Sequence, residues 1–310
     1  YGYEGNDSLD GGEGDDYLFG HAGSDTLTGG LGLDRMYRGV GDDLYYVNDA
    51  TDHAYENAAE GSDKVIASIT HQLRSNIEVL ELSGSADIRG YGNELDNQVI
   101  GNSGDNLLYG REGNDTLTGG AGYDKMYGGL GDDTYIVTDA TDFTYENAGE
   151  GHDKVIASIT HTLRANIEEL ELSGTADIRG YGNAENNLIA GNSGSNLLYG
   201  RDGNDSLFGN AGNDHLFGEN GDDQEREGER DSRNRVGQHR QEIHQLSGPV
   251  ACADYHPRDH ESDDAGNLAR AHRCRADGPN RQRERSGHRR CPFGGRHARP
   301  AVELNAPRRR

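Results

Sequence analysis

Carboxylates recur at a spacing of nine residues in the first part of the chain. Five of them keep this phase without a gap, at Asp7, Asp16, Asp25, Asp34 and Asp43, and each follows a glycine by two residues. Carboxylate oxygens beside turn carbonyls, held at about 2.3 to 2.6 Å, are the ligands that a hard cation such as Ca²⁺ prefers. The spacing therefore indicates a row of calcium sites.

The same phase returns twice further along the chain. It places aspartates at Asp115, Asp124 and Asp133, and again at Asp205, Asp214 and Asp223. Asn106 and Asn196 occupy the aspartate position two repeats before Asp124 and Asp214. An amide oxygen still coordinates a cation but brings no charge, so we expect these two positions to form weaker sites.

The elements that must position these side chains follow from the full nine-residue unit, Gly-Gly-x-Gly-x-Asp-x-apolar-x. Glycine at the first, second and fourth positions permits positive φ angles and the close backbone approach of a tight turn, whose carbonyls point inward. The last three residues are long enough only for a very short strand, with the central side chain directed inward. One unit cannot bury that side chain alone, whereas stacked coils can.

The segment Gly11-Gly-Glu-Gly-Asp-Asp16-Tyr-Leu18-Phe and its siblings resemble the RTX, or haemolysin-type, calcium-binding repeat. The resemblance implies an all-β fold, a right-handed parallel β-roll or β-solenoid, in which two nonapeptides form one coil and each Ca²⁺ lies between stacked turns. Ligands would then pair two nonapeptides apart, as Asp7 with Asp25, Asp25 with Asp43, Asp16 with Asp34, Asp115 with Asp133, and Asp205 with Asp223. Turn carbonyls would contribute around Gly11, Gly14, Gly20, Gly23, Gly29, Gly32, Gly110, Gly113, Gly119, Gly122, Gly200, Gly203, Gly209 and Gly212.

A long duplication organises the repeats. Residues 31–120 align without gaps with residues 121–210, with 63 identities in the 90 pairs. We expect calcium-binding blocks at 1–46, 92–136 and 182–223, separated by β-strand inserts at 47–91 and 137–181. Within the inserts, β-branched residues predict strands at 64–69 and 77–82, with copies at 154–159 and 167–172. We interpret the inserts as a calcium-poor extension of the same solenoid.

The inserts also hold the best candidates for catalysis. His71 and His161 follow an Ile-Thr pair, but no nucleophile or metal ligand recurs beside them at a fixed spacing, so we expect ordinary inter-coil side chains. An acidic cluster formed by Glu56, Glu60 and Asp63 is repeated at Glu146, Glu150 and Asp153. Paired carboxylates can hydrolyse glycosides, but a solvated face or an extra weak cation site is the simpler interpretation. We expect no enzyme in this fragment.

Charge separates the repeats from the rest of the chain. The whole chain carries 30 basic and 55 acidic residues, for a net charge of -25. Residues 1–223 hold 11 of the basic and 42 of the acidic residues, or -31, so we expect no nucleic-acid partner there. Such a Gly- and Asp-rich segment resembles a disordered linker, and without calcium we expect it to be coil-like. No apolar run approaches the roughly 18 to 20 residues of a membrane span.

Residues 224–310 break the pattern and carry 19 arginines against 13 acidic residues, or +6. We expect a disordered tail, produced either by an out-of-frame reading of a coding sequence or by a natural basic segment that binds nucleic acid or anionic surfaces. Cys252, Cys274 and Cys291 lack the Cys-x-x-Cys spacing of a zinc site. Beyond Asp223 the roll should fray for want of a further neighbour.

The resemblance implies a calcium-dependent module of a bacterial secreted protein, similar to the substrates of a type I secretion apparatus, that folds in extracellular calcium. The chain begins within a repeat at Tyr1, so we expect it to be a fragment of a longer protein. Two parents are compatible with it: a long adhesin or matrix protein at the cell surface, and a secreted enzyme or pore-forming toxin whose active domain lies upstream. The tandem 90-residue units favour the adhesin. The oligomeric state is left open.

Overall fold

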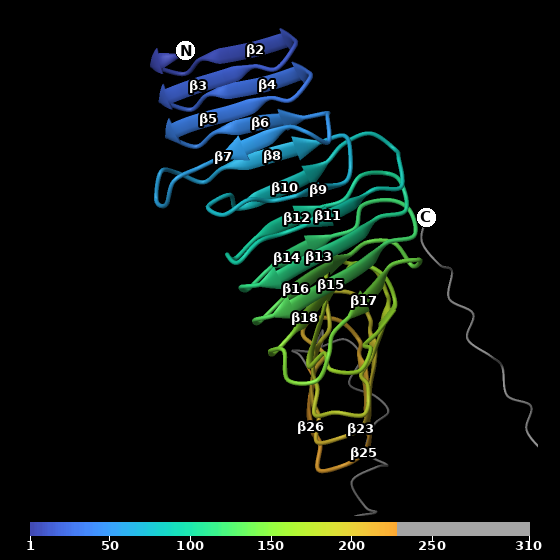
Figure 1. Ribbon diagram of the computed structural model, residues 1–310. Helices are drawn as coiled ribbons and strands as arrows, with labels where there is room; N and C mark the ends of the chain where they lie inside the picture. Colours follow the sequence, from blue (N-terminus) through green and yellow to red (C-terminus); the bar gives the residue numbers. More distant parts are fainter. Residues whose placement is uncertain (228–310) are drawn as a thin grey trace, which may run out of the picture. The chain divides into compact units, whose positions relative to one another are not determined.

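The computed structural model describes residues 1–227, and every regular element in them is a β-strand. The chain winds into a stack of coils in which all paired strands run parallel (Figure 1). This confirms the predicted all-β parallel solenoid. The prediction for the tail falls almost wholly on residues 228–310, which lie outside the described residues. In the part of the chain that the structure describes, no helix is long and apolar enough to cross a membrane.

One face of the coils is a single sheet of 13 strands that runs through blocks and inserts alike. Its strands, in order, are β2 (Ser8–Glu13), β4 (Thr26–Leu31), β6 (Leu44–Val47), β8 (Lys64–Ala67), β10 (Val79–Leu82), β12 (Gln98–Ile100), β14 (Thr116–Thr118), β16 (Thr134–Val137), β18 (Lys154–Ala157), β20 (Glu169–Leu172), β22 (Leu188–Ala190), β24 (Ser206–Phe208) and β26 (Gln224–Arg226).

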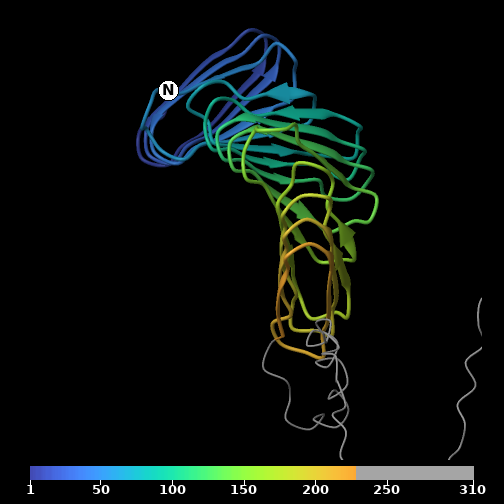
Figure 2. The same ribbon diagram turned by 90° about the horizontal axis from the view of Figure 1, so that it is seen from below.

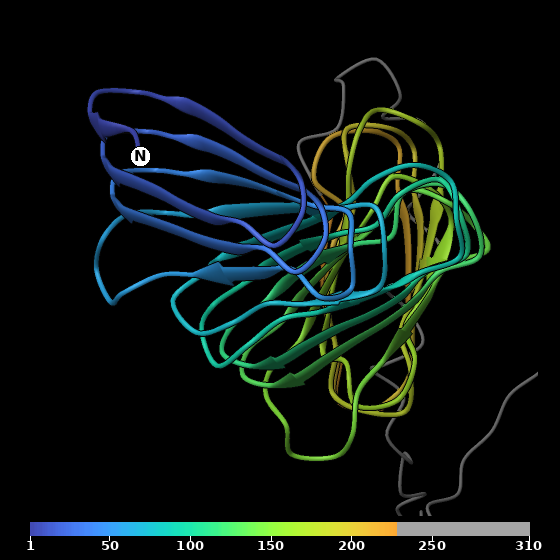
Figure 3. The ribbon, with the colours of Figure 1, turned by 45° about the horizontal axis from the view of Figure 1, so that its top comes forward.

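The opposite face is divided into three shorter sheets, because pairing stops twice within the inserts. The first holds β1 (Tyr3–Glu4), β3 (Tyr17–Ala22), β5 (Arg35–Val40) and β7 (His53–Tyr55); the second holds β9 (His71–Gln72), β11 (Arg89–Tyr91), β13 (Leu107–Glu112), β15 (Lys125–Leu130) and β17 (Phe143–Tyr145); the third holds β19 (His161–Thr162), β21 (Arg179–Tyr181), β23 (Leu197–Asp202) and β25 (His215–Asn220). Figures 2 and 3 show the coils as nested loops around a common interior.

Strand register gives the length of each coil. In the nonapeptide blocks one coil is two nonapeptides long, as the pairs Thr26–Leu44 and Thr116–Thr134 show. The insert replaces three such steps by unequal ones, through the pairs Leu44–Lys64, Lys64–Val79 and Val79–Gln98, of which the first is longer and the second shorter than a regular coil. Together these steps are as long as three regular coils. The nonapeptide phase therefore returns unchanged after each insert, and the long duplication is a period of five coils.

The interior is a narrow apolar column filled from both faces. Each coil contributes the two apolar residues predicted to point inward, one from each nonapeptide, and Leu27, Met36, Tyr45 and Leu117 are fully buried. The inserts continue the column with Val65, Leu80 and Val99, also fully buried, which confirms that they extend the solenoid. The insert strands are shorter than predicted: β8 stops at Ala67, and β10 begins at Val79 because Ile77 and Glu78 belong to the preceding turn.

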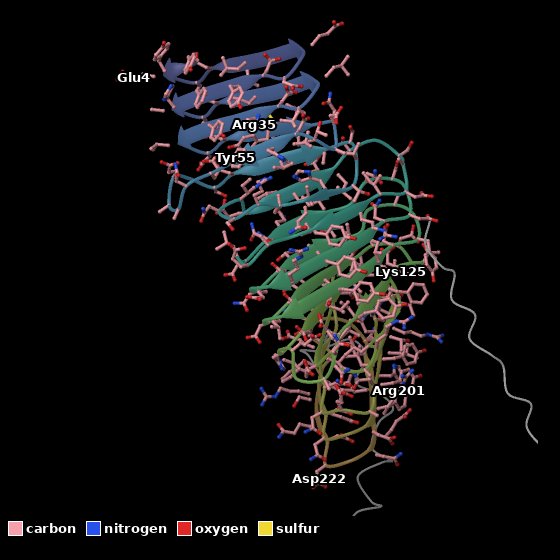
Figure 4. The ribbon with its side chains drawn as sticks, in the orientation of Figure 1. Glu4, Arg35, Tyr55, Lys125, Arg201 and Asp222 are labelled. Atoms are coloured by element: carbon pink, nitrogen blue, oxygen red, sulfur yellow. The ribbon has the colours of Figure 1, made fainter. Side chains whose placement is uncertain are left out.

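Aromatic rings stack along the divided face, at the position after the inward residue of the nonapeptide. Their centroids lie 4.8 to 5.0 Å apart, which follows from the spacing of parallel strands. We call these rows the aromatic ladders: Tyr1, Phe19, Tyr37 and Tyr55; Tyr91, Tyr109, Tyr127 and Tyr145; Tyr181, Tyr199 and Phe217. An arginine of the insert covers the end of the first two ladders, with Arg74 over Tyr55 and Arg164 over Tyr145. Figure 4 labels Tyr55, where the first ladder ends.

Candidate calcium-binding turns

The aspartates of the nonapeptides are stacked in register at the ends of the strands. The Oδ1 atom of each accepts a hydrogen bond from the backbone N–H of the residue one coil earlier, at 2.8 Å from Asp7 to Asp25 and 2.6 Å from Asp115 to Asp133. The same bond joins Asp16 to Asp34, Asp25 to Asp43 and Asp205 to Asp223. All five predicted pairs therefore lie on adjacent coils.

The second carboxylate oxygen has no donor. In the described residues, Oδ2 is buried and lacks a hydrogen-bond partner at Asp7, Asp16, Asp25, Asp34, Asp43, Asp115, Asp124, Asp133, Asp142, Asp205 and Asp214. Most of these side chains are almost completely buried, with Asp34 and Asp124 at 0% exposure. A buried carboxylate oxygen without a donor is costly, so a row of them calls for a positive charge.

The first glycine of each nonapeptide forms a cradle around this oxygen. A Cβ atom at Gly11 would lie 2.8 Å from Oδ2 of Asp16 and would also strike the carbonyl oxygen of Gly29 on the next coil. At Gly110, the corresponding clashes are with Asp115 and the carbonyl of Gly128. The first glycines adopt no positive φ, so the space next to the carboxylate, and not the backbone conformation, requires glycine there.

The second and fourth glycines serve the turn itself. Gly12 and Gly14 have φ angles of 90° and 112°, in the left-handed region, and most of their equivalents do likewise. The carbonyl of Gly14 lies against Gly32 of the next coil, at the distance where a Cβ would clash. The predicted glycine carbonyls thus line the stacked turns, those of the first glycines beside the carboxylates.

Burial shifts the titration of these carboxylates. It raises the pKa of Asp115, Asp133 and Asp142 to about 7, and the pKa of Asp43 and Asp52 to about 6, because the charged form is poorly solvated. Backbone N–H donors oppose the shift without cancelling it. A bound cation would therefore replace the proton on these buried carboxyl groups and stabilise their charged form.

These donors fit Ca²⁺. The turns offer carboxylate and carbonyl oxygens only, which suits a hard cation that takes six to eight oxygen ligands and leaves little for Zn²⁺ or copper. The buried oxygens without donors and the glycine cradles beside them supply the space and the charge. When bound, the ion would neutralise the stacked carboxylates and join consecutive coils.

The asparagine turns behave differently. Asn106 accepts the N–H of Asn102 through Oδ1 at 2.7 Å, and its Nδ2 donates to the carbonyl of Ile88 at 3.2 Å. Asn196 repeats both contacts, with Asn192 at 2.8 Å and Ile178 at 3.2 Å. The amide Nδ2 group donates a hydrogen bond to a backbone carbonyl, at the position where the aspartate has an oxygen atom that can only accept. The role of Asn106 and Asn196 as calcium ligands stays a prediction, and these hydrogen bonds favour a turn held without an ion.

The sequence prediction missed four aspartates that belong to the same stack. Asp52 and Asp142 accept the N–H groups of Asp34 and Asp124 one coil earlier, but no glycine pair precedes them. Asp63 and Asp153 take the corresponding place after the longer first coil of each insert, as acceptors from Asp43 and Asp133. The regular two-nonapeptide spacing could have identified Asp52 and Asp142.

The predicted acidic cluster is divided by the structure. In each copy, one glutamate and one aspartate join an aspartate of the preceding block, with ligand atoms within 4.8 Å of one another: Asp43, Glu56 and Asp63, and Asp133, Glu146 and Asp153. The third predicted members lie apart, because Glu60 and Glu150 accept hydrogen bonds from Asn57 and Asn147 in the turn. Burial raises the pKa of Glu56 and Glu146 to about 8.

His71 and His161 begin β9 and β19. Burial lowers the pKa of both rings to about 4, so they are neutral at physiological pH. At the far end, Asp223 still bonds to Asp205 at 2.9 Å, and β26 pairs with β24 through Ser206 and Gln224, although Glu225 fills the apolar slot and is exposed. The solenoid therefore extends past Asp223, to Arg226.

Comparison with known families follows this geometry closely. The family described as RTX calcium-binding nonapeptide repeat (4 copies) matches residues 1–36, 10–45, 91–126, 100–135, 109–142, 181–214 and 190–225. No curated protein matches the chain. The repeats of this family form a structural, calcium-binding module and are typical of secreted proteins. The matched segments cover the three aspartate blocks and leave out most of each insert, and in these blocks the chain carries RTX calcium-binding nonapeptide repeats.

Proposed function

We propose that residues 1–223 are a module that folds when it meets extracellular calcium, with ions bound at the stacked aspartates. The observation that carries the proposal is the row of buried carboxylate oxygens without donors, which repeats on consecutive coils of the first two blocks and recurs at Asp205 and Asp214 in the third. Bringing these charges together in the absence of a cation costs several kcal/mol for each buried group. Calcium binding then supplies free energy of folding.

The proposed ligands are the predicted aspartates, together with the carbonyls of the glycines that line the same turns. Asp52 and Asp142 join them because they occupy the same stack. The blocks 1–46, 92–136 and 182–223 would bind most of the ions, with Asp52 and Asp142 contributing from the beginning of the inserts. The rest of the inserts 47–91 and 137–181 would space the blocks. Sites with sensor-range or weaker affinity would stay empty at the low calcium concentration of the cytosol. They would bind calcium only at the higher concentration outside the cell, after export.

We further propose that the parent protein is a long adhesin or matrix protein, exported by a type I secretion apparatus. The five-coil period supports this, because the register steps through each insert add up to three regular coils and let units be added without a break in the main sheet. Sequencing the DNA upstream of Tyr1 tests the proposal. Further copies of the long unit would support an adhesin, and a catalytic or pore-forming domain would overturn it in favour of a secreted enzyme or toxin.

The folding step is tested by far-ultraviolet circular dichroism of the whole chain, in chelator and after titration with millimolar Ca²⁺. We expect a coil-like spectrum in chelator and a gain of β signal with Ca²⁺. Mg²⁺ at the same concentration is the control, because it demands a smaller octahedral site and holds its water. A spectrum that does not respond to Ca²⁺ would overturn the calcium-dependent fold.

A further inference from the structure

The two copies of the long unit differ at one buried position beside the acidic cluster. Arg38 of the first copy corresponds to Gly128 of the second in the gapless alignment. The surroundings are the same in both, since Asp43, Tyr45, Glu56 and Asp63 correspond to Asp133, Tyr135, Glu146 and Asp153. The molecule thus presents the same three carboxylates twice, once with an arginine and once with a glycine.

In the first copy the arginine places its charge inside the turn. The Arg38 side chain is fully buried, and its Nη1 donates to the carbonyl oxygen of Asp25 at 2.5 Å and lies 4.0 Å from Oδ1 of Asp43. The guanidinium also lies 3.8 Å from the centre of the Tyr45 ring. The carboxylates of Asp43, Glu56 and Asp63 all act electrostatically on it.

In the second copy the carboxylates face a residue that brings no charge. A Cβ atom at Gly128 would clash with Oδ2 of Asp133 and Oε1 of Glu146, so these oxygens converge where the arginine side chain begins in the first copy. Asp133 is only 1% exposed, and its Oδ2 and the Oε2 of Glu146 have no hydrogen-bond partner in the described residues. The Tyr135 hydroxyl donates to Oε1 and holds the glutamate in place.

We infer that Asp133, Glu146 and Asp153 bind a divalent cation, and that the Arg38 guanidinium replaces this ion in the first copy. The ion is Ca²⁺, because the cluster offers oxygen ligands alone and lies in a turn of the calcium-binding stack. Glu146 comes from the insert, so this site couples the insert to the block before it. The inference rests on the proposed calcium binding of the aspartate turns.

Exchange of the two residues tests the inference in the whole chain. Equilibrium dialysis against ⁴⁵Ca²⁺ at saturation counts the ions bound to the wild type, to Arg38→Gly and to Gly128→Arg. We expect one ion more for Arg38→Gly, one fewer for Gly128→Arg, and the wild-type number when both are combined. Gly128 has no positive φ, so its backbone conformation suits the arginine, and the side chains of Asp133 and Glu146 must both shift to make room for it.

A milder pair of variants keeps the test decisive where Gly128→Arg fails to fold. Glu146→Gln should lose one ion or bind it at least about tenfold more weakly, whereas Glu56→Gln, its match in the first copy, should bind as the wild type does. Equal counts for wild type, Arg38→Gly and Glu146→Gln would overturn the inference while leaving the other sites intact. A wild-type chain that binds no Ca²⁺ would instead overturn the proposed function.

Discussion

In the aspartate turns, Asp115 accepts the N–H of Asn97 at 2.7 Å with one oxygen and leaves the other without a donor. Asn97, one coil earlier, occupies the same place in its own turn, and both polar atoms of its side chain have hydrogen-bond partners. Its Oδ1 accepts the N–H of Asn93 at 2.6 Å, and its Nδ2 donates to the carbonyls of Ile77 at 3.1 Å and Glu78 at 3.3 Å. One atom, oxygen or nitrogen, separates the two kinds of turn.

The difference shows how one backbone can either require a metal or do without it. An amide donates hydrogen bonds to the carbonyls of the previous coil, whereas a carboxylate can only accept, so its coil needs an outside cation. The turn of Asn97 follows a coil whose length differs from two nonapeptides, at the point where the chain leaves the insert and enters the next block. We expect the insert side of each unit to keep its local structure at calcium concentrations that no longer hold the aspartate blocks.

Reciprocal substitution should break the comparison with the largest effect. Asn97→Asp loses two donated hydrogen bonds and sets a charge against carbonyls, so we expect about 2 to 3 kcal/mol of destabilisation at the lowest Ca²⁺ concentration that folds the chain, and less at saturating Ca²⁺. Asp115→Asn should do the opposite, with greater stability at the low Ca²⁺ concentration and a loss at saturating Ca²⁺. Denaturant unfolding followed by circular dichroism under both conditions measures the change.

The duplicate provides the control, since Asn187 makes the same bonds in the second copy, to Ile167 at 3.3 Å and from Asn183 at 2.7 Å. Asn187→Asp should therefore repeat the result of Asn97→Asp. If the two reciprocal variants respond alike at low and at saturating Ca²⁺, the turns do not differ in their need for a cation.

A fall in pH should have an effect of intermediate size, on the aspartate turns and on their affinity for calcium. Burial raises the pKa of Asp115, Asp133 and Asp142 to about 7, so these groups bind protons in the folded state that the unfolded state releases. Between pH 8 and about pH 6.5, a fall in pH should therefore shift the equilibrium in chelator from the coil-like state towards the folded state. Calcium competes with the same protons, and its affinity should fall several-fold, approaching about tenfold per proton displaced as pH drops one unit below the pKa.

The pH range is chosen to leave the histidines out. The pKa of His71 and His161 is lowered to about 4, so these two rings cost stability only as pH falls from their ordinary pKa of about 6.5 towards 4. Calorimetric titration with Ca²⁺ at each pH gives the affinity. An affinity that does not change with pH would mean that the titrating carboxylates do not bind the ion.

The smallest effect concerns the aromatic ladders, at the end where an arginine lies over the last ring. Arg164 lies 4.6 Å from the centre of the Tyr145 ring, and Arg164→Gln should cost about 0.5 to 1 kcal/mol, seen as a small fall in the thermal midpoint at saturating Ca²⁺. Arg164→Lys keeps the cation and should lie between the two. A midpoint unchanged in the glutamine variant would show that Arg164 does not stabilise the end of the ladder through this ring.

Much of the repeating part could be predicted from the sequence, because each nonapeptide carries its own turn and its own inward residue. Leu27 and Met36 are buried as predicted, and the aspartate pairs lie on neighbouring coils. The unequal coils could not be predicted, since the length of a shortened or lengthened coil is set by how the insert closes onto its neighbours. Asp63 was therefore assigned to a local acidic cluster and not to the stack with Asp43.

Arg38 escaped prediction for a related reason. It stands where the nonapeptide has its first glycine, and the pattern alone presents it as one more imperfect repeat. Its role becomes evident only from the burial of its side chain and from the carboxylates that a later coil brings next to it. Substitutions that depart from a repeat are informative where the three-dimensional neighbours come from outside the local unit.

The unbroken sheet of 13 strands has a kinetic consequence. Each strand pairs only with strands one coil before or after it, at a sequence separation that stays close to two nonapeptides, so the loop to be closed does not grow with the length of the chain. The entropic cost of adding a coil is then the same late in the stack as at its start. A polypeptide that emerges from a channel end first can form its structure in the order in which it appears, and lengthening the protein by further units adds time in proportion and no new kinetic barrier.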